Sequence, residues 1–188
     1  TGKTAGFTLP ILQLLSQGKH LSHRPIRALI LTPTRELAAQ ILANIKEYSE
    51  FLDIRSAVIF GGVNQKPQVA QLRQGVDILV ATPGRLLDHI SQGTLSLSQV
   101  KTLVLDEADR MLDMGFFPAI RRILKYVPTK RQTLMFSATM KPEIRELAGS
   151  ILHNPVSISI EPKQKTTELV EQSVCFVPQK QKTRLLIE

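Results

Sequence analysis

The chain has 188 residues, 43% of them hydrophobic, which is enough for one core of ordinary size and little more. Its 24 lysine and arginine residues outnumber its 16 aspartate and glutamate residues, so the formal net charge is +8. This surplus favours a polyanionic partner, although a basic surface without a partner explains it equally well. The single cysteine, Cys175, excludes an internal disulfide framework and indicates a reducing, cytoplasmic location. No stretch approaches the roughly 20 apolar residues of a membrane span, so no membrane partner is expected.

Short apolar runs alternate with longer segments whose apolar residues lie three and four positions apart. The short runs are typical of buried strands and the longer segments of amphipathic helices. In chain order, strands are predicted at 27–32, 56–60, 77–81, 102–105, 133–137 and 156–160, and helices at 34–50, 65–74, 84–91, 118–126 and 142–151. The alternation predicts an α/β fold with an open, mainly parallel sheet and helices on both faces. Ligands bind such sheets at the carboxyl ends of the strands.

A change in composition near residue 160 divides the chain. Residues 161–168 are rich in Pro, Lys, Gln and Thr without apolar periodicity, which predicts a linker after a first domain at 1–160. Beyond the linker, a strand is predicted at 169–177 and a helix from Gln179 onward. Roughly twenty residues cannot bury a core of their own, so 169–188 are expected to be the start of a second domain that the chain does not complete.

The chain opens on Thr1-Gly2-Lys3-Thr4, directly ahead of a helical segment and with no strand in front of it. These residues match the end of a phosphate-binding loop, G-x-x-x-x-G-K-[ST]. In that loop backbone amides hold phosphate, the lysine reaches the β and γ phosphates, and the hydroxyl binds Mg²⁺. Lys3 and Thr4 would take those roles. An ordinary turn before a helix explains the four residues equally well.

Three carboxylates lie within four residues in Asp106-Glu107-Ala108-Asp109, directly after an apolar strand. Clustered carboxylates repel one another, so they imply a bound cation, a shared proton or full solvation. Mg²⁺ binds one or two carboxylates together with waters and phosphates, which suits Asp106 at a strand end. Glu107 could then orient or deprotonate an attacking water. A solvated acidic turn that starts a helix is the simpler alternative.

Taken in their order along the chain, these motifs resemble those of the DEAD-box RNA helicases. Asp106-Glu107-Ala108-Asp109 matches the motif that names the family, and 1–4 match the end of its Walker A motif. The other matches are motif Ia at Pro33-Thr34-Arg35-Glu36-Leu37, the glycine doublet at Gly61-Gly62, motif Ib at Thr82-Pro83-Gly84-Arg85 and motif III at Ser137-Ala138-Thr139. The resemblance implies the first RecA-like lobe of a P-loop NTPase that uses ATP and Mg²⁺ to unwind or remodel short RNA duplexes. The spelling is most similar to bacterial members of the RhlE kind.

The arginines of motifs Ia and Ib lie where predicted strands give way to helices. Arg35 and Arg85 could therefore act with the nearby helix N-termini on a nucleic-acid backbone. The glycines of these motifs and of the doublet would let that backbone approach closely, because they carry no Cβ. Such contacts bind phosphate and sugar with little sequence preference. An intrahelical ion pair of Arg35 with Glu36 or a neighbour, and plain turn geometry for the glycines, are the simpler alternatives.

Ser137 and Thr139 follow a predicted strand, and their hydroxyls could hydrogen-bond Asp109. The resemblance implies that this link couples ATP hydrolysis to strand separation; otherwise the segment is a strand end with an N-cap. The resemblance also implies that the chain lacks the adenine-recognising Q motif, the strand before the phosphate loop and most of the second RecA-like lobe, whose arginine fingers complete the site. We therefore expect the 188 residues alone to be inactive.

Two other functions stay open from the residues alone. One is a DNA-directed or dual-specificity helicase, because backbone contacts do not reveal whether a 2′-hydroxyl is read. The other is a non-catalytic nucleic-acid clamp or annealing module with a vestigial ATP site. The retained Lys3, Thr4, Asp106 and Glu107 argue against the clamp, because a protein that never hydrolyses ATP has no need of that set.

Overall fold

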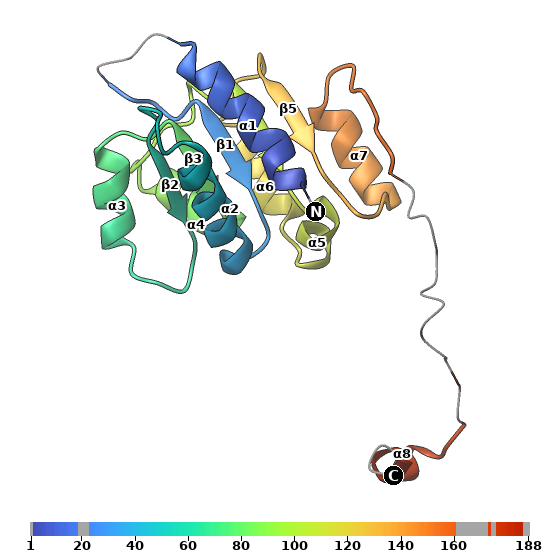
Figure 1. The fold of residues 1–188 in the computed structure, drawn as a ribbon. Helices are drawn as coiled ribbons and strands as arrows, with labels where there is room; N and C mark the ends of the chain where they lie inside the picture. Colours follow the sequence, from blue (N-terminus) through green and yellow to red (C-terminus); the bar gives the residue numbers. More distant parts are fainter. Residues whose placement is uncertain (1, 19–22, 161–172, 174–175, 186–188) are drawn as a thin grey trace. The chain divides into compact units, whose positions relative to one another are not determined.

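A five-stranded parallel sheet is the centre of the fold (Figure 1). The computed structural model describes residues 2–18, 23–160, 173 and 176–185. The strands, in the order β2-β3-β1-β4-β5 across the sheet, are β1 (Ala28–Leu31), β2 (Ser56–Ile59), β3 (Ile78–Ala81), β4 (Thr102–Leu105) and β5 (Gln132–Met135). Their last residues pair in one row, with Leu31 opposite both Ala81 and Leu105. The residues that follow the strands therefore share one edge, as the predicted α/β architecture requires.

Helices cover both faces of this sheet, because successive strand residues point to opposite sides. Ala28 and Ile30 pack with residues of α1 and α2, whereas Leu29 and Leu31 pack with residues of α4 to α7. Figure 1 shows α1 and α2 crossing the same face. The helices are α1 (Lys3–Ser16), α2 (Arg35–Tyr48), α3 (Lys66–Arg73), α4 (Pro83–Ser91), α5 (Ala108–Asp113), α6 (Phe117–Leu124) and α7 (Pro142–Ile151). Within the described residues, none of the helices is both long and apolar enough to span a membrane.

Five of the six predicted strands and all five predicted helices are confirmed within residues 27–151, with ends shifted by at most two positions. The strand predicted at 156–160 is wrong. Residues 155–160 have no regular structure, and Val156, Ile158 and Ile160 are 84–89% exposed. Alternating apolar residues make a strand only where a neighbouring strand satisfies their backbone groups, and the sheet found among the described residues does not include this segment.

Contacts divide the chain into two units, Thr1–Asn154 and Pro155–Glu188. In the second unit, the predicted helix after Gln179 is present as a 3₁₀ turn, η1 (Gln179–Gln181), followed by α8 (Lys182–Leu185). The predicted linker at 161–168 lies outside the described residues, as does most of the strand predicted at 169–177. The division into a first lobe, a linker and the start of a second lobe stays a prediction.

The amino edge of the sheet is held by a buried carboxylate. Asp77, just before β3, accepts hydrogen bonds from Arg24 Nη1 at 3.0 Å, Arg27 Nη2 at 2.7 Å and the backbone N–H of Arg55 at 2.9 Å. Arg24 also pairs with Asp53. Since Arg27 precedes β1 and Arg55 precedes β2, one side chain ties together the starts of three strands. Two guanidinium groups compensate the buried charge of Asp77, as a stable fold requires.

Candidate active site and nucleic-acid interface

The carboxyl edge of the sheet collects four of the six predicted motifs into one site. Asp106 N donates to Leu31 O at 2.9 Å, and Phe136 N donates to Leu105 O at 2.8 Å, so the chain leaves β1, β4 and β5 side by side. The charge of Lys3 at the start of α1 also acts on Asp106. The acidic motif therefore lies next to motif III and to Lys3 at the start of α1, and motif Ia begins beside them. Thr1 lies outside the described residues.

The start of α1 has the features of a phosphate-binding turn. Gly2 is the N-cap and has φ of 73°, a conformation that L side chains rarely adopt. The first turn of α1 contains no acidic residue, and no side chain caps it. Its N–H groups and the positive end of the helix dipole therefore face the site without a competing carboxylate. Lys3 and Thr4, the two residues predicted to bind phosphate and Mg²⁺, are the first two residues of this helix.

Asp106 is a buried carboxylate without a cation of its own. The side chain accepts one hydrogen bond, from the backbone N–H of Glu107 at 3.1 Å, and within the described residues it has no ion pair. Burial raises the pKa of Asp106, and the neighbouring charge of Glu107 raises it further. The described part of the chain has no group of three or more His, Cys, Asp or Glu side chains that could hold a metal by itself. Asp106 thus suits Mg²⁺, which takes one or two protein carboxylates and fills its shell with waters and phosphates.

Glu107 occupies an unusual backbone position. Its φ of 53° and ψ of 54° lie in the left-handed region, which costs a non-glycine residue roughly 1–2 kcal/mol. Its Oε2 lies 3.3 Å from Nη1 of Arg110, one turn later in α5. Residues with a strained backbone cluster at functional sites, where contacts with the surrounding structure hold them in that conformation. This backbone conformation determines the direction in which the Glu107 side chain extends from the end of β4.

Asp109 and motif III are joined by several hydrogen bonds. Oδ2 of Asp109 accepts from Ala138 N at 3.1 Å, from Thr139 N at 3.0 Å and from the Thr139 hydroxyl at 3.3 Å. Burial would raise the pKa of Asp109, but the hydrogen bonds from Arg110 N and Thr139 outweigh it and lower that pKa. The predicted link from Thr139 to Asp109 is confirmed.

The predicted hydrogen bond between Ser137 and Asp109 is also present, but it is made to the backbone of Asp109. The Ser137 hydroxyl accepts from the backbone N–H of Asp109 at 3.2 Å and donates to Thr139 O at 2.7 Å. It therefore does not bond the carboxylate. Since a hydroxyl has one proton, and Thr139 O takes it, the backbone N–H of Asp109 is the partner left for its lone pair.

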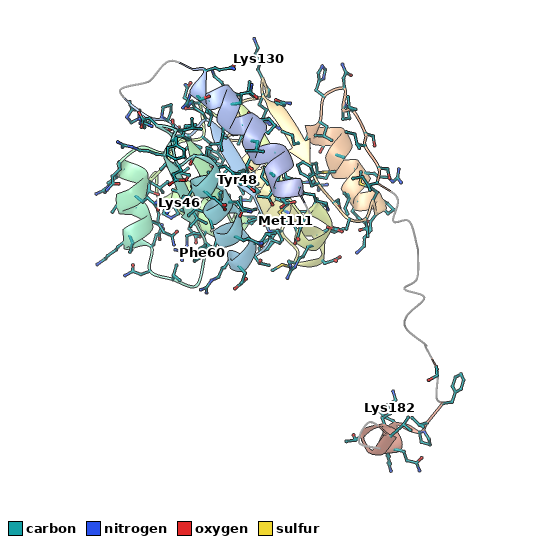
Figure 2. All side chains as sticks on the ribbon, in the orientation of Figure 1. Lys46, Tyr48, Phe60, Met111, Lys130 and Lys182 are labelled. Atoms are coloured by element: carbon teal, nitrogen blue, oxygen red, sulfur yellow. The ribbon has the colours of Figure 1, made fainter. Side chains whose placement is uncertain are left out.

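Motif Ia and the glycine doublet lie against each other beside α2. Thr34 caps α2, because its hydroxyl accepts from Leu37 N at 3.3 Å. The Arg35 guanidinium carbon is 5.3 Å from the centroid of the Phe60 ring, a residue labelled in Figure 2 at the end of β2. A Cβ on Gly62 would lie 2.7 Å from Arg35 Nη1. No ion pair between Arg35 and Glu36 occurs in the structure, so that alternative has no support.

The glycines of the interface differ in what their backbone requires. Gly62 has φ of 75°, so its own turn needs glycine. A Cβ on Gly61 or on Gly84 would meet no heavy atom within 4 Å. At these two positions internal packing does not require glycine, which is consistent with space kept free for a ligand backbone. The turn-geometry alternative therefore holds for Gly62 alone.

Arg85 is less accessible than the sequence indicated. Its side chain is 11% exposed and donates from Nη2 to Val63 O at 3.0 Å, with Nε 3.6 Å from Asp88 Oδ2. Arg85 thus supports the loop of the glycine doublet. Direct contact of this side chain with phosphate stays a prediction. Thr82 and Pro83, the other residues of motif Ib, are the N-cap and first residue of α4, where their helix start faces the same edge as α2.

Sequence reasoning missed one buried polar cluster beneath this interface. His89, on the buried face of α4, contacts Gln68 of α3 and Thr94. The available signal was a histidine at a position where helical spacing predicts an apolar residue.

Comparison with known proteins agrees with the geometry. Residues 1–147 match the family model described as DEAD/DEAH box helicase. Over 186 residues the chain is 44% identical to the ATP-dependent RNA helicase CshA of Listeria monocytogenes, covering 99% of this chain and 35% of that protein. It is 44% identical over 188 residues to the ATP-dependent rRNA helicase RRP3 of Meyerozyma guilliermondii, covering 39% of that protein.

Solved structures give the same result. The yeast DEAD-box splicing factor Prp28 aligns with a TM-score of 0.76 and 40% identity, over 81% of this chain and 37% of that one. A DEAD box protein from the hyperthermophile Methanococcus jannaschii aligns with a TM-score of 0.75 and 42% identity, over 82% of this chain and 41% of that one. The chain thus spans between about a third and two fifths of the length of these relatives. With most of its length matched by the family model and its acidic motif joined to motif III at the sheet edge, the chain belongs to the DEAD/DEAH box helicase family.

Proposed function

We propose that the full protein carrying this chain is an ATP-dependent RNA helicase that unwinds or remodels short RNA duplexes. The observation that carries the proposal is the convergence of Lys3, the buried Asp106 and the Asp109–Thr139 link at one edge of the sheet. Relatives over nearly the whole chain are named ATP-dependent RNA helicases, which supports the same activity. A cytoplasmic location and a closer kinship with the RhlE kind stay predictions.

The residues at this edge fit ATP with Mg²⁺. Lys3 and the N–H groups at the start of α1 would bind the phosphates, and the Thr4 hydroxyl and Asp106 carboxylate would hold the metal. When bound, Mg²⁺ would neutralise charge on the β and γ phosphates. The raised pKa of Asp106 supports this assignment, because burial and the charge of Glu107 outweigh the charge of Lys3, and a bound cation would favour the ionised carboxylate.

Glu107 would activate the attacking water. Its carboxylate would accept a proton from the water as the water oxygen bonds the γ-phosphorus and the bond to the ADP oxygen breaks. Arg110, 3.3 Å away, would hold that carboxylate in position. The bonds from Thr139 to Asp109 would then carry the change at the phosphates to the segment after β5.

The interface for RNA would lie along the starts of α2 and α4 and the glycine doublet. Gly61 and Gly84 leave open space where a Cβ would stand, Thr34 is the N-cap of α2, and Arg35 lies over the Phe60 ring next to the doublet. Helix N-termini and a guanidinium bind phosphate and sugar, so little sequence preference is expected. A second RecA-like lobe of the same protein would complete both the nucleotide site and the RNA site.

Replacing the water-activating carboxylate tests the proposal. In the full protein, Glu107→Gln should lower RNA-stimulated ATP turnover by roughly 10²–10⁴-fold, the usual contribution of a general base. Binding of ATP with Mg²⁺ should not change, because the metal and phosphate ligands remain. Glu143→Gln, at an exposed position on α7, is the matched control.

Three outcomes separate the alternatives. Unchanged turnover in Glu107→Gln would remove the catalytic role from this residue. A wild-type protein that binds and anneals RNA without hydrolysing ATP would favour the clamp. Equal unwinding of DNA and RNA duplexes would favour a dual-specificity helicase.

A further inference from the structure

A buried polar cluster lies between α3 and α4 and is hydrogen-bonded to the residue before the glycine doublet. His89 is fully buried and Gln68 is 8% exposed, although the other buried residues of α4, such as Leu86, pack in the apolar core. Buried polar groups cost free energy unless their hydrogen bonds are made. Their cost is offset here by a connected set of bonds.

A series of hydrogen bonds connects the loop after α4, which contains Thr94, with Phe60, the residue before the glycine doublet. The Thr94 hydroxyl lies 2.7 Å from Nδ1 of His89, and Nε2 of His89 lies 3.3 Å from Oε1 of Gln68. Nε2 of Gln68 then donates to the carbonyl oxygen of Phe60 at 3.1 Å. His89 is the middle of this chain.

The Gln68 amide determines the protonation of the ring. Because its nitrogen is used by Phe60 O, its oxygen faces His89, so Nε2 of the ring carries the proton and donates. Nδ1 then carries no proton and is an acceptor, with the Thr94 hydroxyl at 2.7 Å and the amide nitrogen of Gln65 at 3.4 Å. Burial lowers the pKa of His89, and the positive charge of Arg85 lowers it further, which is consistent with a neutral ring.

Both ends of the doublet loop are therefore held from α4. The Phe60 carbonyl immediately precedes Gly61 and is held by His89 through Gln68. The Val63 carbonyl, just after Gly62, accepts from Arg85, one turn before His89 on the same helix. The Phe60 ring in turn lies under the Arg35 guanidinium.

We propose that His89 is a positioning residue for RNA binding, holding the loop 61–63 and Phe60 in the geometry that places Arg35 and the open backbone of Gly61 at the RNA. The inference rests on the proposed function, because it assigns that loop to the RNA interface. His89 touches neither nucleotide nor RNA; it acts through Gln68.

Kinetics of the full protein test this role. His89→Leu removes the ring contacts with Gln65, Gln68 and Thr94 while filling similar space, and it should raise the KM for RNA in RNA-stimulated ATP hydrolysis by about tenfold. The kcat at saturating RNA and the affinity for ATP without RNA should each stay within about twofold, since the bonds at Asp106 and Asp109 are untouched. His89→Gln keeps an N–H donor for Gln68 and should restore the KM to within about threefold of wild type. Ser91→Ala, at an exposed position in the last turn of α4 where the hydroxyl bonds only Asp88 O of the same helix, is the control.

Two further variants decide the question if His89→Leu does not fold. Gln68→Met and Thr94→Val remove the neighbouring bonds of the same chain, and each should raise the KM for RNA while sparing the ATP affinity. An unchanged KM for RNA in folded variants would overturn the proposal, as would an equal loss of RNA and ATP affinity, which would mark a general structural role. Failure of the proposed function looks different, because the wild-type protein itself would then show no RNA-stimulated hydrolysis.

Discussion

Two buried aspartates lie at opposite edges of the same sheet and have opposite surroundings. Asp77, at the amino edge, has two guanidinium partners and a backbone N–H. Asp106, at the carboxyl edge, has one backbone N–H, and its pKa is raised by burial and by Glu107. The charge of Asp77 is compensated by two guanidinium groups, whereas Asp106 has no ion pair within the described residues.

The contrast gives a criterion for separating structural from functional carboxylates. Burial alone does not distinguish Asp77 from Asp106, because both are at most 5% exposed. Compensation by positively charged partners does distinguish them. An uncompensated buried charge lowers stability, and residues of this kind are found mainly at functional sites. A similar distinction applies to the glycines. The left-handed backbone of Gly62 requires glycine for the turn itself, whereas the backbone and packing of Gly61 do not.

The largest expected effect is on stability at the amino edge. Asp77→Asn should lower the free energy of unfolding by about 3–5 kcal/mol, because Arg24 and Arg27 lose their shared counter-ion. Asp106→Asn should change it by less than about 1 kcal/mol, yet stop ATP turnover. Urea denaturation of both variants measures the difference. Equal losses of stability would end the distinction between the two edges.

A smaller effect is expected at the glycine doublet. Gly62→Ala should cost about 1–2 kcal/mol, because it forces a side chain into the left-handed region and against Arg35. Gly61→Ala should leave the melting temperature unchanged while weakening RNA binding, because its Cβ extends into open space. Thermal melts and RNA titrations of the two variants side by side check this. Normal RNA affinity in Gly61→Ala would show that the open space is not used.

The link between Asp109 and motif III should contribute about 1 kcal/mol through the Thr139 hydroxyl. Thr139→Val removes that donor and keeps both backbone donors, so ATP turnover should persist while unwinding per ATP falls. Thr133→Val, on β5 away from the acidic motif, serves as the control. Proportional loss of turnover and unwinding would show that the hydroxyl has no coupling role.

The smallest expected effect is a pH dependence from Asp106. Its folded-state pKa is raised above the ordinary 3.8, so from that pH upward the folded protein retains a proton that the unfolded chain has lost. Stability from this group is therefore present at low pH and is lost as pH rises through the raised pKa. Denaturation of wild type and Asp106→Asn from about pH 4 to about pH 7 should show the variant gaining relative stability as pH rises. A constant difference would contradict the raised pKa.

Local patterns in the sequence were enough to predict the strands of the sheet and the family motifs. Apolar runs such as 28–31 and 102–105 are short and continuous, and Asp106-Glu107-Ala108-Asp109 sits within one turn. The prediction failed at 156–160, where the same alternation is present without a paired neighbour. Strand pairing is a long-range property, so the pattern of one segment does not contain it.

Sequence by itself therefore determined the family, the parallel α/β fold and the chemical nature of Lys3, Asp106 and Glu107, because residue type and spacing carry that information. Only the tertiary structure decided which charges are compensated, that Arg85 supports a loop, and that His89 holds the glycine doublet through Gln68. Those properties depend on contacts between different helices, strands and loops, where packing and hydrogen-bond geometry select among partners that the sequence presents equally.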